Sequence, residues 1–201
     1  ANEELGDRLN DSIYSNGYST TDKQGDVAIG GNLKTADKYK MANEINQKFV
    51  DVIRATGGNN ANRHLLIPGY NTDIEKTVNA RFVMPKDTAE NGKTKLFVSV
   101  HYYTPWDFCG DGGAGSYTYG DRQKTVENFE LLKRFSDEGY AYIIGECGVC
   151  SPQTVTGSVT AWFNDTFKEA AKYHAVPVLW ETGQYFDRTA ATLKFKDVAV
   201  Y

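Results

Sequence analysis

Short apolar runs alternate with longer amphipathic segments along the chain, and this alternation constrains the fold more than any other feature. Residues 38–56 carry apolar side chains mostly at three- and four-residue spacing and precede Gly57-Gly58, which predicts a helix with a glycine stop. The run at 64–68 is short and continuous, as in a buried parallel strand. The same order recurs, with strands predicted at 95–100, 141–144 and 176–180 and helices at 125–137 and 158–174.

Strands that alternate with helices predict an α/β fold with a parallel sheet and right-handed crossovers. The pattern alone leaves open whether the sheet is open or closed into a barrel. An open sheet that binds a nucleotide carries a glycine-rich turn after its first strand, and neither GxGxxG nor GxxxxGK[ST] follows the first predicted strand. This disfavours nucleotide binding.

Composition narrows the function classes further. The 201 residues are 40% hydrophobic and 24% charged, which suits one globular domain with a buried core. The net charge is −4, and no cluster of Lys and Arg is interleaved with aromatic residues, so nucleic acid is not an expected partner. No apolar run approaches the roughly 20 residues that span a bilayer, and the first residues lack the layout of a signal peptide. A membrane is therefore not an expected partner either.

Two segments, 15–36 and 104–121, are rich in glycine and polar residues and are predicted to be long functional loops. The second contains Trp106 and Phe108, which we expect to stack on sugar rings, because exposed aromatic side chains on loops suit flat apolar ligand faces. The alternative is that these aromatic residues pack under the loops.

Polar and aromatic side chains follow the C-terminal ends of the predicted strands. The second strand leads to His101-Tyr-Tyr103, the third to Glu146, and the fourth ends in Trp180. In a parallel α/β barrel the active site is built at that rim from several strands at once. We therefore expect these side chains to share one site.

A second carboxylate is available near the start of the chain. Asn2-Glu3 stands where a further strand would end, so Glu3 and Glu146 are expected to face each other across the rim. Glycosidic cleavage needs two opposed carboxyl groups. One donates a proton to the leaving oxygen, and the other attacks C1 or activates water.

Four short motifs, in this order, resemble those of a known family. They are Asn2-Glu3, His101-Tyr-Tyr103, Ile144-Gly-Glu146 followed by Gly148, and Trp180, accompanied by ATGGNN at 55–60 and IPGY at 67–70. Their order and spacing resemble strands four to eight of glycoside hydrolase family 5, which contains cellulases and endo-β-1,4-glucanases. The resemblance covers essentially the whole chain and implies a (β/α)8 TIM barrel.

This resemblance also implies an activity and roles for individual residues. It implies a retaining, endo-acting β-1,4-glycan hydrolase of the endoglucanase kind, with Glu146 as the nucleophile and Glu3 as the acid/base. Asn2 is expected to bind the sugar 2-OH, and His101 to line the −1 subsite. Tyr103 is expected to orient the nucleophile or the surroundings of the proton donor.

The family pattern extends to the substrate. Trp180 matches the aromatic platform of the last strand. Trp106, in the glycine-rich loop after His101, is also expected to bind substrate, and Glu181, Gln184 and Tyr185 after Trp180 are further candidates for subsites. The implied partner is a β-linked polysaccharide or oligosaccharide. No cofactor and no metal are implied. A polymeric substrate also leads us to expect a secreted protein.

The resemblance further implies that residues 1–201 are the C-terminal part of one catalytic domain, beginning at the end of the fourth strand. Such an incomplete barrel has an open edge with unpaired backbone groups. We therefore expect the chain to pair with the N-terminal half of the barrel or with another copy of itself.

Plainer interpretations compete with these assignments. Glu3 near a terminus and Glu146 after a strand are alternatively solvated surface charges, and His101 is alternatively a core histidine. The absence of neighbouring His or Cys residues beside His101 disfavours a metal site. Trp162 lies on the apolar stripe of a predicted helix and is expected in the core. As a function from another class, the chain is a carbohydrate-binding or barrel-assembly fragment without turnover.

The three cysteines include a CxxC pair, Cys147 and Cys150. A redox centre needs its first cysteine at the start of a helix, and the residues after Cys150 delay any predicted helix, which disfavours that role. Zinc would need four ligands. A disulfide between Cys109 and either Cys147 or Cys150 remains open, and it would leave one thiol unpaired.

Overall fold

A computed structural model describes residues 3, 5–7, 34–113, 115–151, 156–189 and 194–196. The chain divides into two compact units. Unit 1 comprises Ala1–Val100 with Arg134–Ala141, and unit 2 comprises His101–Lys133 with Tyr142–Tyr201. Each unit is described in turn.

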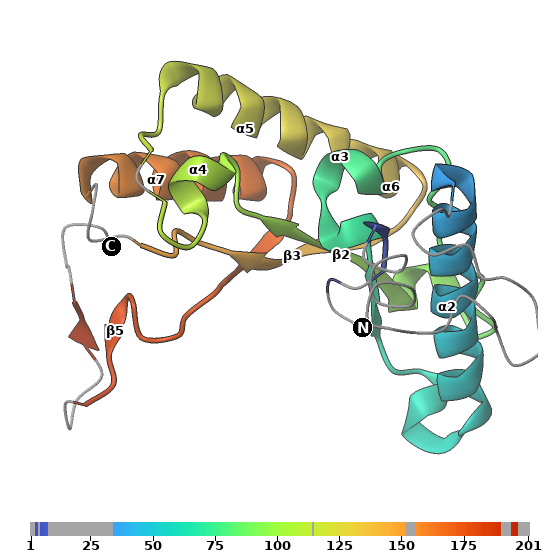
Figure 1. Ribbon diagram of the computed structural model, residues 1–201. Coiled ribbons are helices and arrows are strands. Elements are labelled where there is room, and N and C mark those ends of the chain that lie inside the picture. The colour runs from blue at the N-terminus through green and yellow to red at the C-terminus, as the bar shows by residue number, and fades with distance from the viewer. Residues whose placement is uncertain are drawn as a thin grey trace, which may run out of the picture. The chain divides into compact units, whose positions relative to one another are not determined.

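Unit 1 is built on helix α2 (Thr35–Ala55) and on strand β1 (Leu65–Pro68), which pairs in parallel with the first part of β2 (Leu96–Tyr102) (Figure 1). The pairing runs from Leu65 opposite Leu96 to Pro68 opposite Ser99. Three residues of the helix, Tyr39, Ala42 and Val50, lie on one face and are buried, as the apolar spacing predicted.

A buried polar contact fixes this helix to the strand. The Asn46 side chain on α2 donates to the Pro68 carbonyl at the end of β1, with N and O 3.1 Å apart, which gives this backbone acceptor a partner. The helix then stops at Gly57 and Gly58, whose φ angles of 65° and 55° lie in the left-handed region that favours glycine. The predicted glycine stop is therefore confirmed.

The short helix η1 (Gly58–Ala61) lies between α2 and β1. Three further short elements connect β1 to β2: η2 (Tyr70–Thr72), α3 (Ile74–Thr77) and η3 (Gly92–Lys95). Helix α6 (Lys133–Asp137) supplies Arg134, whose guanidinium donates to the carbonyls of Val78, Asn79 and Phe82 and so ties this connection in place.

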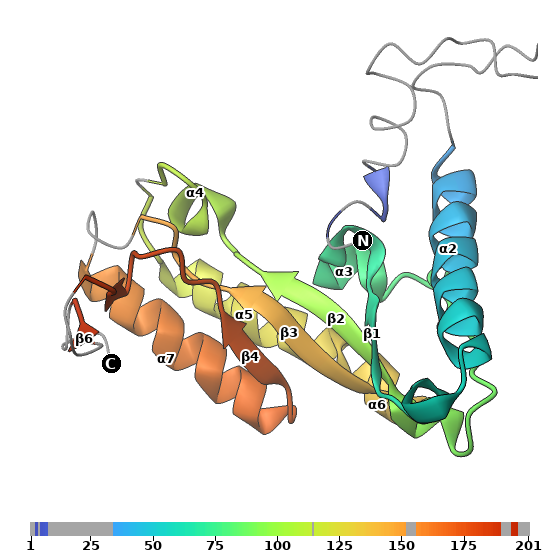
Figure 2. The same cartoon turned by 90° about the horizontal axis from the view of Figure 1, so that it is seen from below.

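Unit 2 contains the end of β2, strand β3 (Ala141–Cys147) and strand β4 (Val176–Leu179). In this unit β3 lies beside β4 in parallel, with Ile143 opposite Val176 and Cys147 opposite Leu179. Helices α5 (Tyr119–Leu131) and α7 (Thr156–Lys172) lie side by side against one face of β3 and β4 (Figure 2). This is the layering of a βα repeat.

Aromatic packing fills the space between these layers. Tyr102 at the end of β2 stacks on Trp162 of α7 with ring centroids 6.0 Å apart and contacts Phe129 of α5 edge-on at 5.1 Å. The Trp162 indole also donates to the Thr104 carbonyl at 2.8 Å. Trp162 is fully buried, so its predicted place in the core is confirmed. A small antiparallel pair, β5 (Phe186–Asp187) with β6 (Lys194–Phe195), follows β4.

The helix predicted at 125–137 begins earlier and is split in two. Thr118 and Asp121 form a capping box, in which the Thr118 amide donates to the Asp121 carboxylate at 2.7 Å, so α5 starts at Tyr119. The first turns are polar, which is why apolar periodicity did not reveal them. The loop predicted at 104–121 is correspondingly shorter and contains the one-turn helix α4 (Trp106–Cys109). Most of the other predicted loop, residues 15–33, lies outside the described residues.

Both strands that lead to the predicted site are longer than expected: β2 runs to Tyr102 and β3 to Cys147, so His101 and Glu146 lie within strands rather than after them. Within the described part of the chain, no helix combines the length and apolar character needed to cross a membrane.

Candidate active site

Glu146 is the centre of the candidate site in unit 2. Its Oε2 accepts a hydrogen bond from the Tyr103 hydroxyl at 3.2 Å and lies 3.3 Å from Nδ1 of His101. The Glu146 side chain is 15% exposed, so it is partly sheltered yet open to a ligand. Three residues that the sequence placed at strand ends therefore meet around one carboxylate oxygen.

The backbone explains how these side chains converge. His101 is near the end of β2, and Tyr103 lies two residues further on, so the extended chain directs both to the same side. On β3, Ile144 lies opposite Pro177 and Cys147 opposite Leu179, so β3 carries one residue more than β4 across this interval. Such a bulge turns the strand locally, and Glu146 lies within it.

The surroundings keep Tyr103 protonated. Burial raises the pKa of its hydroxyl, and the negative charge of Glu146 together with their hydrogen bond raises it further. At neutral pH the hydroxyl is therefore a proton-bearing donor toward the carboxylate. A carboxylate that accepts such a bond is held in one orientation.

Two exposed aromatic side chains accompany the carboxylate. Trp106 on α4 is 67% exposed and meets the Tyr103 ring edge-on, with centroids 6.2 Å apart. Trp180 follows β4 and is 43% exposed, and its amide donates to the Cys147 carbonyl at 2.8 Å. Both indoles therefore expose apolar faces. Trp106 contacts Tyr103, which bonds Glu146, and Trp180 bonds Cys147, the residue after Glu146.

Other predicted aromatic contacts are wrong. Phe108, expected to stack on sugar, is buried and packs on Tyr117. Tyr185, expected in a subsite, is only 3% exposed, and its hydroxyl bonds both the amide and the carbonyl of Val149. The Glu181 carboxylate accepts from the amides of Gly183 and Tyr185 and so holds the turn after Trp180. Phe108, Tyr185 and Glu181 therefore support the backbone around the site and do not form its surface.

Glu3, the second predicted carboxylate, is half-buried and belongs to unit 1. The segment beside it is attached near the C-terminal end of β1, because the Asn71 amide donates to the Leu5 carbonyl at 2.7 Å. This is the strand end at which a barrel builds its site. Asn2 lies outside the described residues.

No sequence pattern predicted the charged cluster around Asp7. Its carboxylate accepts from Tyr70, Asn71 and Lys76 and lies 3.4 Å from the Lys38 ammonium group. Although burial acts to raise the pKa of Asp7, these hydrogen bonds hold it well below its usual range. The cluster anchors the segment that contains Glu3. Only spatial proximity, and no local pattern, brings its members together.

The three cysteines are free thiols in the structure. Burial raises the pKa of Cys147 to about 12, and its Sγ lies 3.5 Å from the Val178 carbonyl. A thiol of this kind is almost entirely protonated at neutral pH and is a poor nucleophile. The geometry thus disfavours a redox centre at the CxxC pair.

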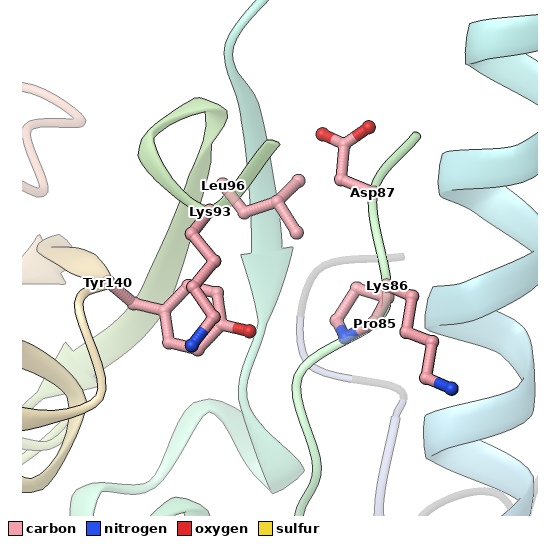
Figure 3. A pocket seen from close by; sticks show the side chains of 6 residues that line it. All are labelled: Pro85, Lys86, Asp87, Lys93, Leu96 and Tyr140. Carbon is pink, nitrogen blue, oxygen red and sulfur yellow. The ribbon is translucent and has the colours of Figure 1, made fainter. Parts of the chain in front are cut away.

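Unit 1 contains a cavity of about 330 Å³ at the start of β2. Figure 3 shows its lining: Pro85, Lys86, Asp87, Lys93, Leu96 and Tyr140. Leu96 is the first residue of β2, whereas His101 lies near the other end of that strand. Since none of the predicted site residues lines it, this cavity is not the candidate active site.

Comparison with known proteins places the chain in a family. Residues 17–186 match the cellulase family, glycosyl hydrolase family 5. Endoglucanase A of Paenibacillus barcinonensis is 33% identical over 72% of this chain and 42% of its own length. A xyloglucan-specific endo-beta-1,4-glucanase of Bacteroides ovatus is 31% identical over 86% of this chain and 38% of its own length. The chain thus spans about two fifths of the length of these relatives.

Solved structures show the same likeness. A glycoside hydrolase 5 lichenase from Caldicellulosiruptor sp. F32, in complex with cellotetraose, gives a TM-score of 0.69 at 26% identity, over 78% of this chain and 44% of that one. A Bacteroides ovatus GH5 xyloglucanase in complex with a XXXG heptasaccharide gives 0.69 at 31% identity, over 82% and 40%. The predicted fold class, part of a (β/α)8 barrel, is therefore confirmed, and the chain belongs to glycosyl hydrolase family 5.

Proposed function

We propose that the protein is a retaining, endo-acting β-1,4-glycan hydrolase in which Glu146 is the nucleophile and Glu3 the acid/base. The observation that carries this proposal is the placement of Glu146 Oε2 between the Tyr103 hydroxyl and His101 Nδ1 at the end of β3. Membership of glycosyl hydrolase family 5 and relatives named endoglucanases support the reaction class.

In the first step the Glu146 carboxylate attacks C1 of the sugar while the carboxylic acid of Glu3 protonates the leaving glycosidic oxygen. A glycosyl ester forms on Glu146, and Glu3 then removes a proton from the water that hydrolyses it. Retention requires the two carboxyl groups to be about 5–5.5 Å apart in the working enzyme. The hydroxyl of Tyr103 orients Glu146 for attack and stabilises the carboxylate when the ester is cleaved.

The substrate class follows from the aromatic side chains. Trp180, just after β4, and Trp106, at the start of α4, both expose flat apolar ring faces. Such faces suit stacking on the rings of a β-linked glucan. The relatives include an endoglucanase and a xyloglucan-specific enzyme, so plain and substituted β-1,4-glucans are the substrates to test first. We place the reaction outside the cell, because a polymer of this size is not imported intact.

The test is a reducing-sugar assay on carboxymethylcellulose and xyloglucan with the protein in the form that its gene encodes. Glu146→Gln keeps the shape of the side chain but removes the nucleophile, so turnover should fall by more than about 1,000-fold. Glu181→Gln is the matched control, because that carboxylate holds a turn instead. Near-wild-type turnover by Glu146→Gln would show that the assignment is wrong.

The second candidate function is a carbohydrate-binding fragment without turnover. The exposure of Trp106 and Trp180 favours glycan binding independently of catalysis. Calorimetry with cellotetraose, run beside the reducing-sugar assay, separates the two: binding without hydrolysis supports the fragment, and hydrolysis supports the enzyme.

A further inference from the structure

Two segments of unit 2 meet at a pair of cysteines. The Cys150 amide, after β3, donates to the Cys109 carbonyl at the end of α4, with N and O 2.8 Å apart. A second contact joins the same segments, because the Gly112 amide donates to the Ser151 hydroxyl at 3.2 Å. The segments therefore run together at the cysteines and immediately after them.

This backbone contact sets the separation of the two cysteines. The path between the two Cα atoms adds the N–Cα, C=O and C–Cα bonds to the hydrogen bond and bends at N, O and C, so the two Cα atoms lie roughly 5–6.5 Å apart. Disulfides span Cα separations of about 4.4–6.8 Å. We propose that Cys109 and Cys150, free thiols in this structure, form a reversible disulfide that fastens α4 to the segment after β3.

Cys147, the third cysteine, contacts a different part of unit 2. Cys147 is fully buried within β3, and its Sγ lies 3.5 Å from the carbonyl of Val178 on β4. Cys109, in contrast, is joined to Cys150 by the backbone hydrogen bond from the Cys150 amide to the Cys109 carbonyl. Burial is the main cause that raises the pKa of Cys109, and negative charges on Cys150, Asp107 and Cys147 raise it further. The pairing is therefore Cys109 with Cys150, and Cys147 remains a thiol.

The two thiols differ in exposure, and this difference determines which of them reacts first with an oxidant. Cys150 is half-buried and reachable, whereas Cys109 is fully buried. With oxidised glutathione as the oxidant, the Cys150 thiolate attacks one sulfur, forms a mixed disulfide and releases one glutathione thiolate. Burial raises the pKa of Cys109, so only a small fraction of it is thiolate at pH 8. This thiolate attacks the Cys150 sulfur within the same molecule and releases the second glutathione. The two cysteine thiols lose two protons and two electrons, and the glutathione disulfide is reduced.

The bond would act on the substrate-binding side of unit 2. Helix α4 contains the exposed Trp106, and Cys150 lies four residues after Glu146 of β3. The disulfide would therefore fix the position of α4 relative to the end of β3. This consequence rests on the proposed function, whereas the pairing itself does not. Oxidation should therefore lower the KM for β-glucan and leave kcat within about twofold.

The test is oxidation of the full chain with oxidised glutathione at pH 8, followed by alkylation, digestion without reductant and mass spectrometry. We expect a peptide pair joined through Cys109 and Cys150, and a melting temperature that rises by roughly 5 °C or more, since a disulfide across about 40 residues restricts the unfolded chain. Reduction with dithiothreitol should reverse both changes. Cys147→Ala should still form the pair, whereas Cys150→Ser should neither form it nor gain stability.

Two outcomes would overturn the proposal. One is a stable mixed disulfide of Cys150 with glutathione that never exchanges with Cys109. The other is a Cys147–Cys150 peptide pair in the wild-type chain. Both readouts are independent of hydrolysis, so failure of the pairing is distinguishable from failure of the proposed function.

Discussion

The Tyr103 hydroxyl donates to Oε2 of Glu146 across 3.2 Å, and the Trp106 ring meets the Tyr103 ring edge-on. A single tyrosine thus connects the proposed nucleophile to an exposed aromatic face. Through this hydrogen bond, the segment after β2 orients the carboxylate on β3 that we propose as the nucleophile.

Tyr103→Phe should lower kcat by about 10- to 100-fold with little change in KM, because a hydrogen bond to a charged group contributes about 1.5–3 kcal/mol. Steady-state kinetics on carboxymethylcellulose measure this effect. Tyr102→Phe is the matched control, since its hydroxyl donates to Thr125 in the core at 2.9 Å. A loss of kcat in Tyr102→Phe as large as in Tyr103→Phe would contradict a specific role for Tyr103.

Trp106→Ala should raise KM by roughly 3- to 10-fold on β-glucan, because removal of one stacking face costs about 0.5–1.5 kcal/mol of binding free energy. The indole contacts the Tyr103 ring, and it is the Tyr103 hydroxyl that bonds Glu146, so kcat should change less. Tyr119→Ala removes another highly exposed aromatic side chain, at the start of α5, and serves as the comparison. Equal effects of both substitutions on KM would argue against stacking at Trp106.

The Arg54–Asp87 pair should contribute to the acid sensitivity of unit 1. Its side chains are 5% and 1% exposed, with the guanidinium and carboxylate 2.7 Å apart. The hydrogen bond from Arg54 lowers the pKa of Asp87 despite burial. A lowered folded-state pKa means that the pair stabilises the fold above the ordinary pKa of 3.8 and that this contribution is lost as the pH falls below it.

Asp87→Asn should therefore cost about 3–5 kcal/mol of unfolding free energy at pH 7, because it leaves a buried guanidinium without its partner. The difference from wild type should shrink as the pH falls below 3.8. Urea denaturation at pH 7, 5 and 3 measures it. Glu44→Gln, in an exposed pair with Lys40, should change stability by less than about 0.5 kcal/mol. A pH-independent difference for Asp87→Asn would contradict this assignment.

Iodoacetamide should alkylate one thiol per native chain, at Cys150, because the other two cysteines are buried. Burial and the charge of Asp111 raise the pKa of Cys150 above 9.0, so the labelling rate should keep rising with pH through that value. Peptide mass spectrometry of the labelled chain measures both. Hydrolysis should survive labelling, and insulin reduction should be absent; loss of hydrolysis on alkylation would favour a thiol-dependent mechanism instead.

The sequence predicted those features that depend on local patterns of apolar residues. His101, Tyr103, Glu146 and Trp180 were found because each follows or ends an apolar run, and the termini of parallel strands meet at one rim. The α2 helix was found because its buried face has regular spacing.

Features that depend on distant contacts were not predictable. Tyr185 lies in a loop beside polar residues, yet its hydroxyl bonds the backbone of Val149, which is 36 residues away. The Asp7 cluster likewise forms between residues more than 30 positions apart. The start of α5 was missed for another reason: its capping box, Thr118 with Asp121, is local, but apolar spacing does not detect such a polar signal.

The most direct test of the proposed mechanism is to trap its covalent intermediate. A 2-deoxy-2-fluoro-β-cellobioside with an activated leaving group slows hydrolysis of the glycosyl-enzyme, and mass spectrometry of the digested protein then locates the adduct. We predict one added 2-deoxy-2-fluorocellobiosyl group on the peptide that contains Glu146, and none in Glu146→Gln. An adduct on another carboxylate, or hydrolysis of the reagent with inversion at C1, would contradict the assignment of Glu146 as the nucleophile.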